Sequence, residues 1–203
     1  MAPVMNQLLP VFAAQGAAMA VEEQPFTIET RTARYDIRQY DSMVVAETRI
    51  EGDFDEAGSR GFKILADYIS GKNQSRTKVA KDFFMSQQAP SEKIAMTAPV
   101  NQVQSPWGFL VQFTMPASFT LATLPKPTDD RVHLREIPAR RIAVLRYSGS
   151  WSEAHYLAKR RELLSALKED GIRTTGASVF ARFNSPFQLW FLRRNEIWIE
   201  VRP

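Results

Sequence analysis

The sequence contains no cysteine and only two histidines among its 203 residues. The absence of cysteine excludes disulfide bonds, thiolate metal sites and cysteine nucleophiles. His133 and His155 do not have a metal-ligand spacing such as H-x3-H, so a structural histidine is the favoured interpretation of each. No apolar run approaches the ~20 residues that span a bilayer, and the sequence therefore predicts no integral membrane segment.

Sequence signatures of common catalytic sites are also missing. There is no G-x-S-x-G motif, no Walker loop and no dinucleotide-binding fingerprint. The acidic pair Asp129-Asp130 falls in a predicted loop, where solvated charge is the usual interpretation. The sequence therefore leaves the question of an enzyme open, but it favours a protein that is not one.

The basic residues form no stripe. The formal net charge is +4, and Lys and Arg are interleaved with Asp and Glu along the chain. This pattern favours an ordinary, mildly cationic surface over nucleic-acid binding. With 44% hydrophobic and 24% charged residues, the chain suits one globular domain or two fused half-domains. Its oligomeric state is unknown.

Residues 1–24 differ from the rest of the chain because they lack Lys and Arg. An apolar patch at 8–14 and a run of small residues that ends at Ala20 resemble a signal-peptide cleavage region. The missing basic start and Pro10 within the patch favour a frayed amphipathic leader instead. Both interpretations stay open, so periplasmic or exported and cytoplasmic locations are equally compatible, and the domain is predicted at 25–203.

An internal duplication relates Tyr35–Ala57 to Val132–Ala154, 97 positions later. Without a gap, the two stretches share an arginine, a glycine and a glutamate at equivalent places. Each also contains a capping-box pattern, Asp53-x-x-Glu56 and Ser150-x-x-Glu153, which is typical of a helix start. We therefore expect two packed copies of one supersecondary unit, over about 35–116 and 132–203.

Each copy is predicted to contain strands, a helix and a hairpin. The helices are expected at about 54–70 and 151–169, and the first hairpin is expected to pair 92–100 with 109–116 across a turn at 102–108. Gly58 and Gly61 within the first helix each cost ~1 kcal/mol relative to Ala, which indicates either close helix-on-sheet packing or room for a flat ligand. The predicted fold is α+β, an antiparallel sheet or distorted barrel with two helices.

Five motifs carry a resemblance to a known family. They are Y-D-I-R-Q-Y at 35–40, F-x-x-L-x-x-Y-I-S-G-x-N at 62–73, K-I-A-M-T-A-P-V at 93–100, L-P-K-P-T-D at 124–129 and L-R-R-N-E-I-W at 192–198. In order and spacing they closely resemble the SOUL haem-binding protein family, in which the chain is identified as a bacterial member. The resemblance implies a distorted antiparallel β-barrel of two pseudo-symmetric halves flanked by two helices. The layout is also similar to bacterial effector-binding domains that hold hydrophobic cations.

For function, the resemblance implies non-enzymatic, non-covalent binding of b-type haem or a related tetrapyrrole. The ligand would occupy a shallow apolar cleft beside the first helix, with basic residues near the propionates. The residues that match the family motifs at such a cleft are Phe62, Leu65, Ile69, Met96, Arg193 and Arg194. The segment 183–190, expected to be a loop rich in apolar residues, is a further candidate for its wall.

One position departs from the family pattern. Some members have a histidine within the Y-x-I-R-x-Y strand, where this chain has Gln39. That strand therefore offers no histidine to iron, and the metal ligand, if there is one, stays unknown. Two alternatives stay open: a sensor or binding module for other hydrophobic amphiphiles, and an enzyme that acts on tetrapyrroles.

Overall fold

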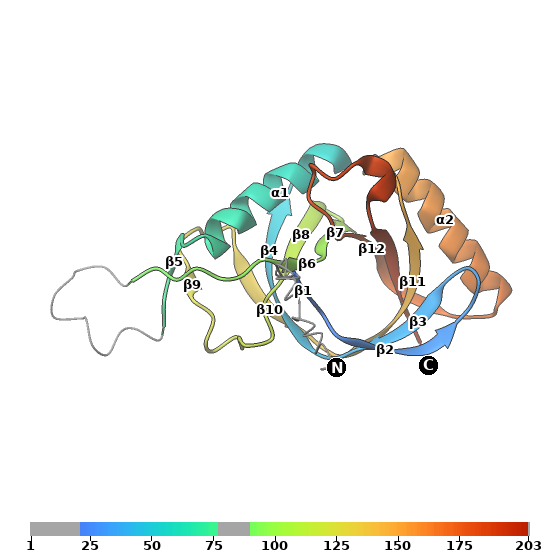
Figure 1. The fold of residues 1–203 in the computed structure, drawn as a ribbon, viewed down its shortest axis with the longest axis horizontal. Helices are drawn as coiled ribbons and strands as arrows, with labels where there is room; N and C mark the ends of the chain where they lie inside the picture. The colour runs from blue at the N-terminus through green and yellow to red at the C-terminus, as the bar shows by residue number, and fades with distance from the viewer. Residues whose placement is uncertain (1–20, 77–89, 203) are drawn as a thin grey trace, which may run out of the picture.

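The computed structural model describes residues 21–76 and 90–202. Within these residues, a large antiparallel sheet carries two helices, which confirms the predicted α+β class (Figure 1). The strands of this sheet are β2 (Phe26–Arg31), β3 (Asp36–Tyr40), β4 (Met43–Ile50), β7 (Val100–Ser105), β8 (Gly108–Thr114), β10 (His133–Ile137), β11 (Arg140–Tyr147), β12 (Thr174–Arg182) and β13 (Asn195–Val201). The helices are α1 (Phe54–Ile69), α2 (Glu153–Glu169) and the short 3₁₀ helix η1 (Trp190–Leu192).

Four two-residue strands form two small additional sheets. β1 (Glu22–Glu23) pairs in parallel with β6 (Thr97–Ala98), and β5 (Asn73–Gln74) pairs with β9 (Lys126–Pro127). The first pair includes residues of the predicted leader. Residues 1–20, on which the signal-peptide interpretation depends, lie outside the described residues.

The strand order in the large sheet is β10-β4-β8-β7-β12-β13-β11-β3-β2. From β10 to β3 this order is symmetric about the β7–β12 pair. In this symmetry β8 corresponds to β13, β4 to β11 and β10 to β3. That arrangement is consistent with the predicted duplication, which stays a prediction. The sheet curves strongly (Figure 1), but it is not closed into the expected barrel, because β10 and β2 are its two edges.

Both faces of the sheet bury apolar residues. Both helices lie against the outer, convex face (Figure 1), where Phe180 and Ile197 belong to the main core together with α1 and α2. Alternate residues point to the opposite, inner face, as the pleat of a strand requires. There Tyr40, Ile142 and Trp198 belong to a second, smaller core cluster.

The start of α1 was predicted correctly, and the start of α2 was not. Asp53 is the N-cap of α1, and its side chain accepts a hydrogen bond of 2.8 Å from the Glu56 backbone N–H. In the second copy the N-cap is Ser152 instead of Ser150, and its side chain makes no capping bond. The hydroxyl groups of Ser150 and Ser152 lie 3.0 Å apart and hydrogen-bond to each other.

The first hairpin also differs from its prediction. β7 begins at Val100 instead of ending there, and it pairs with β8 across a turn at Pro106 and Trp107. Proline has no N–H to give to a strand ladder, so Pro99 lies before the paired strand and not inside it. Residues 92–96 lead into the short strand β6.

The two glycines of α1 have different neighbours. A Cβ atom added at Gly61 would lie 2.5 Å from the Cβ of Val111 on β8, so α1 needs a glycine there to approach the sheet. A Cβ atom added at Gly58 would lie 2.6 Å from Nη1 of Arg182 and 2.7 Å from Oε1 of Gln102. Gly61 therefore serves helix-on-sheet packing, whereas Gly58 makes room for polar side chains.

No helix among the described residues is both long enough and apolar enough to cross a membrane.

Candidate functional site

Large apolar side chains are exposed in the segment that connects β12 to β13. We call residues 186–192 the apolar loop. Phe187 is 95% exposed and Trp190 62%, and Leu189, Phe191 and Leu192 are each more than half exposed. A contiguous exposed apolar surface of this kind commonly marks a site that binds a ligand or a partner.

The apolar loop is held against the start of α2. The Arg193 guanidinium donates from Nε to the carbonyl of Gln188 at 2.9 Å and from Nη2 to that of Pro186 at 2.8 Å. The same guanidinium lies 4.2 Å from the ring centroid of Trp151, and the Gly149 N–H donates to the Trp190 carbonyl at 3.1 Å. Arg193 therefore anchors the loop.

Arg194 is also fully engaged. It forms ion pairs with Glu23 at 2.8 Å and with Glu196 at 3.1 Å, and it lies 3.7 Å from the ring centroid of Phe183. The two arginines predicted for the propionates thus have partners within the protein. Either would have to give up a contact to bind a ligand carboxylate.

The first turns of α1 and α2 meet beside the apolar loop (Figure 1). The ring of Phe54 in α1 stacks on that of Tyr156 in α2, with centroids 5.0 Å apart. Close to this contact lie three polar side chains from the sheet, Gln102, Tyr147 and Arg182, which we call the inter-helix cluster. Arg182 lies 5.4 Å from the ring centroid of Trp151 and fills the space left by Gly58.

The electrostatics of the inter-helix cluster follow from burial. Burial lowers the pKa of the Arg182 guanidinium to about 10, and only Tyr147 opposes that shift. Burial also raises the pKa of the Tyr147 phenol. The cluster is therefore a buried cation next to a neutral hydroxyl donor.

The apolar residues predicted for the cleft do not line one open surface. Leu65 is fully buried and Ile69 is 7% exposed, and both face the main core. Met96 is partly buried against the same core. Phe62 is 39% exposed and packs edge-on against Phe113 with ring centroids 5.3 Å apart, so it alone of the four is open to solvent.

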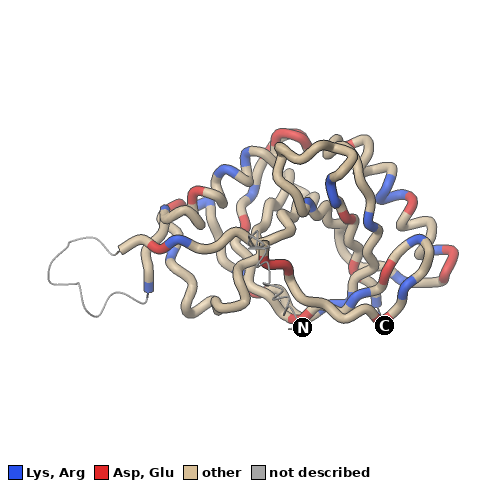
Figure 2. The backbone as a smooth tube through the Cα atoms, viewed as in Figure 1, with Lys and Arg blue, Asp and Glu red and all other residues tan. Residues whose placement is uncertain are grey.

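A second surface beside α1 is cationic. An open groove of about 810 Å³, which we call the basic groove, is lined by four cations, two acids and the 73% exposed Trp107. The cations are Arg49, Arg60, Lys63 and Arg131, and the acids are Glu51 and Asp67. Figure 2 shows the basic residues along α1. Arg131 is paired with Asp129 at 2.6 Å, and this pair lowers the pKa of Asp129 to about 2. Sequence reasoning missed this groove because its cations come from three separate segments.

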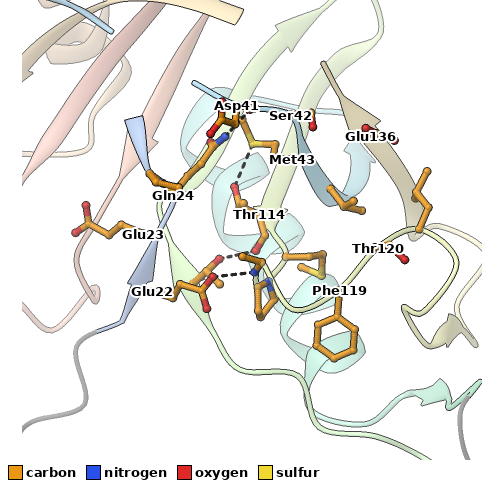
Figure 3. A pocket seen from close by; sticks show the side chains of 17 residues that line it. Glu22, Glu23, Gln24, Asp41, Ser42, Met43, Thr114, Phe119, Thr120 and Glu136 are labelled. Atoms are coloured by element: carbon orange, nitrogen blue, oxygen red, sulfur yellow. Dashed lines mark hydrogen bonds between the residues drawn. The ribbon is translucent and has the colours of Figure 1, made fainter. Parts of the chain in front are cut away.

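A pocket of about 360 Å³ has the opposite charge (Figure 3). We call it the acidic pocket, because four carboxylates and neither Lys nor Arg occur among its described lining residues. The carboxylates belong to Glu22, Glu23, Asp41 and Glu136. Its apolar side chains include those of Met43, Met115, Phe119 and Leu121.

The two histidines lie on different elements, a strand and a helix. His133 is exposed on the edge strand β10, opposite Glu47. His155 lies in the first turn of α2, where its ring packs edge-on against Tyr147 with centroids 5.0 Å apart. The described residues contain no group of three or more His, Cys, Asp or Glu side chains that could hold a metal ion.

The side chain of Gln39 is half-buried on β3, and its amide donates to the Tyr40 carbonyl at 3.2 Å.

Together, the curved sheet, the two outer helices and the apolar loop define an α+β domain with an exposed apolar surface. The SOUL heme-binding protein family matches residues 21–200, and the chain belongs to this family. It is 29% identical to human Heme-binding protein 2, covering 94% of this chain and 91% of that protein. It is 25% identical to Heme-binding protein 1 of Xenopus tropicalis, covering 81% and 82% respectively.

Solved structures show the same fold at low sequence identity. The EcmrR C-terminal domain has a TM-score of 0.57 and 11% identity, covering 83% of this chain and 97% of that one. A hydrolase from Listeria innocua has a TM-score of 0.52 and 16% identity, covering 86% and 94%. These matches concern the fold alone.

Proposed function

We propose that this protein binds haem or a related tetrapyrrole, without covalent attachment and without catalysing a reaction. The observation that carries the proposal is the apolar loop, whose large side chains are more than half exposed beside the N-terminal ends of α1 and α2. Membership of the SOUL heme-binding protein family and the names of the two relatives support the ligand class.

The proposed contact follows from the shape and polarity of a porphyrin. Its flat, apolar plane gains free energy when it covers exposed aromatic side chains, at roughly 25 cal/mol per Å² of apolar area buried. Trp190 and Phe191 already pack edge-on, with ring centroids 5.6 Å apart, and present aromatic surface to solvent. Of the residues predicted on α1, the proposed site keeps Phe62, which is exposed. Leu65 and Ile69 are buried in the main core, where they pack α1 against the sheet.

Titration of the full chain with ferric haem and with metal-free protoporphyrin tests this proposal. We expect saturable quenching of tryptophan fluorescence by both, and a shift of the haem Soret band. Replacing Trp190 and Phe191 together by Ala should weaken binding by roughly tenfold or more, because a truncated aromatic anchor commonly costs above ~1.4 kcal/mol. Both residues are exposed, so the variant should fold normally.

Trp107→Ala is the matched control, because Trp107 is another largely exposed tryptophan, at 73% against 62% for Trp190, and lies in the basic groove beside α1. Its affinity should equal that of the wild type. Loss of affinity in Trp107→Ala alone would move the site to the basic groove, and a wild type that binds neither compound contradicts the proposal. If haem binds much more tightly than the metal-free compound, an iron ligand contributes, and His155→Ala tests the histidine nearest the loop.

The acidic pocket favours a second candidate function, the binding of a cationic amphiphile. Apolar walls of Met43, Met115 and Phe119 with surrounding carboxylates suit a hydrophobic cation, because the walls take its apolar groups and the acids compensate its charge (Figure 3). Asp41 and Glu136 have no ion pair within the described part of the chain, so their charges are available.

Thermal denaturation with tetraphenylphosphonium, and with its anionic counterpart tetraphenylborate, tests this second candidate. A ligand that binds only the folded protein raises its melting temperature. We expect the cation alone to do so, and Asp41→Asn with Glu136→Gln to abolish the rise. Equal effects of the two ions, or no effect of either, would exclude a charge-selective pocket.

A further inference from the structure

Arg182 is a cation without a counter-charge. Its Nε and Nη2 atoms are buried, and neither has a hydrogen-bond partner within the described residues. No carboxylate among those residues forms an ion pair with it, whereas Arg38 on β3 and Arg194, just before β13, are each paired with a carboxylate. In the same cluster, the Tyr147 hydroxyl and Oε1 of Gln102 are also buried and unpaired.

This arrangement conflicts with the usual rule for buried polar groups. The large majority of such groups are hydrogen-bonded, and a buried charge that lacks a partner is strongly destabilising. Here three unpaired groups gather in one place, between two helices. The fold therefore maintains a cationic position that no carboxylate among the described residues compensates.

The surroundings favour an anion. The first turns of α1 and α2 converge on the cluster, and the N-terminal end of a helix carries a partial positive charge. The N-cap of α2, Ser152, makes no side-chain capping bond, which leaves N–H groups of that turn without this partner. Gly58 leaves the room that the Arg182 guanidinium occupies, because a Cβ atom at this position would lie 2.6 Å from Nη1.

We propose that Arg182 and Tyr147 form the binding site for a carboxylate group of the ligand, which is a propionate when the ligand is a tetrapyrrole. This inference rests on the proposed tetrapyrrole binding and assigns the acid group of that ligand to one position. The planar guanidinium suits bidentate pairing with a carboxylate, and the Tyr147 hydroxyl is a second donor. Arg193 and Arg194, the motif arginines, are occupied by the loop carbonyls and by Glu23 and Glu196.

The test compares metal-free protoporphyrin with its dimethyl ester, which has the same plane but no charge. We expect the wild type to bind the diacid at least roughly tenfold more tightly than the ester, because the uncharged ester cannot form a charge-assisted pair with the guanidinium. Arg182→Gln should lose this preference and bind both compounds with the affinity that the wild type has for the ester. Arg161→Gln, at an exposed position on α2, is the matched control and should keep the preference.

Stability separates a binding role from a structural one. Because Arg182→Gln removes an uncompensated buried charge, its melting temperature without ligand should equal or exceed that of the wild type. A structural arginine would give the opposite result, a lower melting temperature. Arg182→Lys should recover part of the preference for the diacid, since it restores the charge but not the planar fork.

The outcomes distinguish this inference from the proposed function. A wild type that binds diacid and ester equally well overturns the carboxylate site and leaves tetrapyrrole binding in place. Preference for the diacid that survives Arg182→Gln also overturns it, and points to the basic groove instead. A wild type that binds neither compound overturns the proposed function and this inference together.

Discussion

Glu196→Gln is expected to lower the free energy of unfolding by about 3–5 kcal/mol, the typical cost of removing one partner from a buried ion pair. Glu196 is fully buried on β13 and accepts hydrogen bonds from Arg38 at 3.2 Å and from Arg194 at 3.1 Å. Trp198 donates to the same carboxylate at 2.7 Å. One carboxylate thus compensates two arginines on the inner face of the sheet.

The size of the effect follows from what the substitution leaves behind. Burial by itself would lower the pKa of Arg38, but Glu196 and hydrogen bonds to Tyr40 and Asp36 raise it above its ordinary value. The amide of Gln has the same shape as the carboxylate without its charge, so Arg38 keeps its burial and loses its main counter-ion. Asp36, at 3.0 Å, compensates only part of that loss.

Urea denaturation measures this change, and Glu51→Gln is the control because Glu51 is exposed. The control should change the free energy of unfolding by no more than about 0.5 kcal/mol. A loss below ~1 kcal/mol in Glu196→Gln would show that water reaches the inner face and screens the pair. The contrast with Arg182→Gln, which should not destabilise, separates the paired buried arginine from the unpaired one.

The parts of the fold that depend on local sequence were predictable. The start of α1 was correct because the Asp53 side chain accepts a hydrogen bond from the Glu56 backbone N–H within the first turn. In the second copy the same pattern was misleading, because Ser150 hydrogen-bonds Ser152 and the helix begins two residues later than expected. Whether the sheet closes depends on long-range pairing between β10 and β2, which local patterns do not determine.

The sequence indicated the composition of the exposed apolar surface, whereas the residues of the binding site stay a prediction. The run P-F-Q-L-W-F-L before two arginines indicated apolar surface with cations, and the structure places that surface in the open. Leu65 and Ile69 were assigned to the cleft because they match a family motif, and their helical spacing is the same for a residue that faces a ligand and one that faces a sheet. They face the sheet.

Arg182 was missed because its sequence context offers no signal. It ends a strand of small and apolar residues, and only the three-dimensional contacts show that Arg193 and Arg194 have partners whereas Arg182 has none among the described residues. A glycine within a helix was the nearest clue, since Gly58 is required by the guanidinium that lies against it.

Raising the pH above about 10 is expected to unfold the protein in one cooperative step with the ionisation of its tyrosines. The chain has five tyrosines, and burial raises the pKa of every one: Tyr35, Tyr40, Tyr68, Tyr147 and Tyr156. The pKa of Tyr35 and that of Tyr40 are each raised to about 12. In an unfolded chain a tyrosine titrates near a pKa of about 10.

The sign follows from proton linkage. Because the folded state holds these protons more tightly, their contribution to stability is complete below pH ~10 and is lost as the pH rises through 10 towards 12 and beyond. The tyrosinate absorbance band and far-ultraviolet circular dichroism, followed on one sample, should therefore change together.

Tyr147→Phe should shift the transition to higher pH with little loss of stability at neutral pH, because the Tyr147 hydroxyl has no hydrogen-bond partner among the described residues. Five phenols that ionise near pH 10 while the circular dichroism stays constant would mean that the tyrosine side chains reach water.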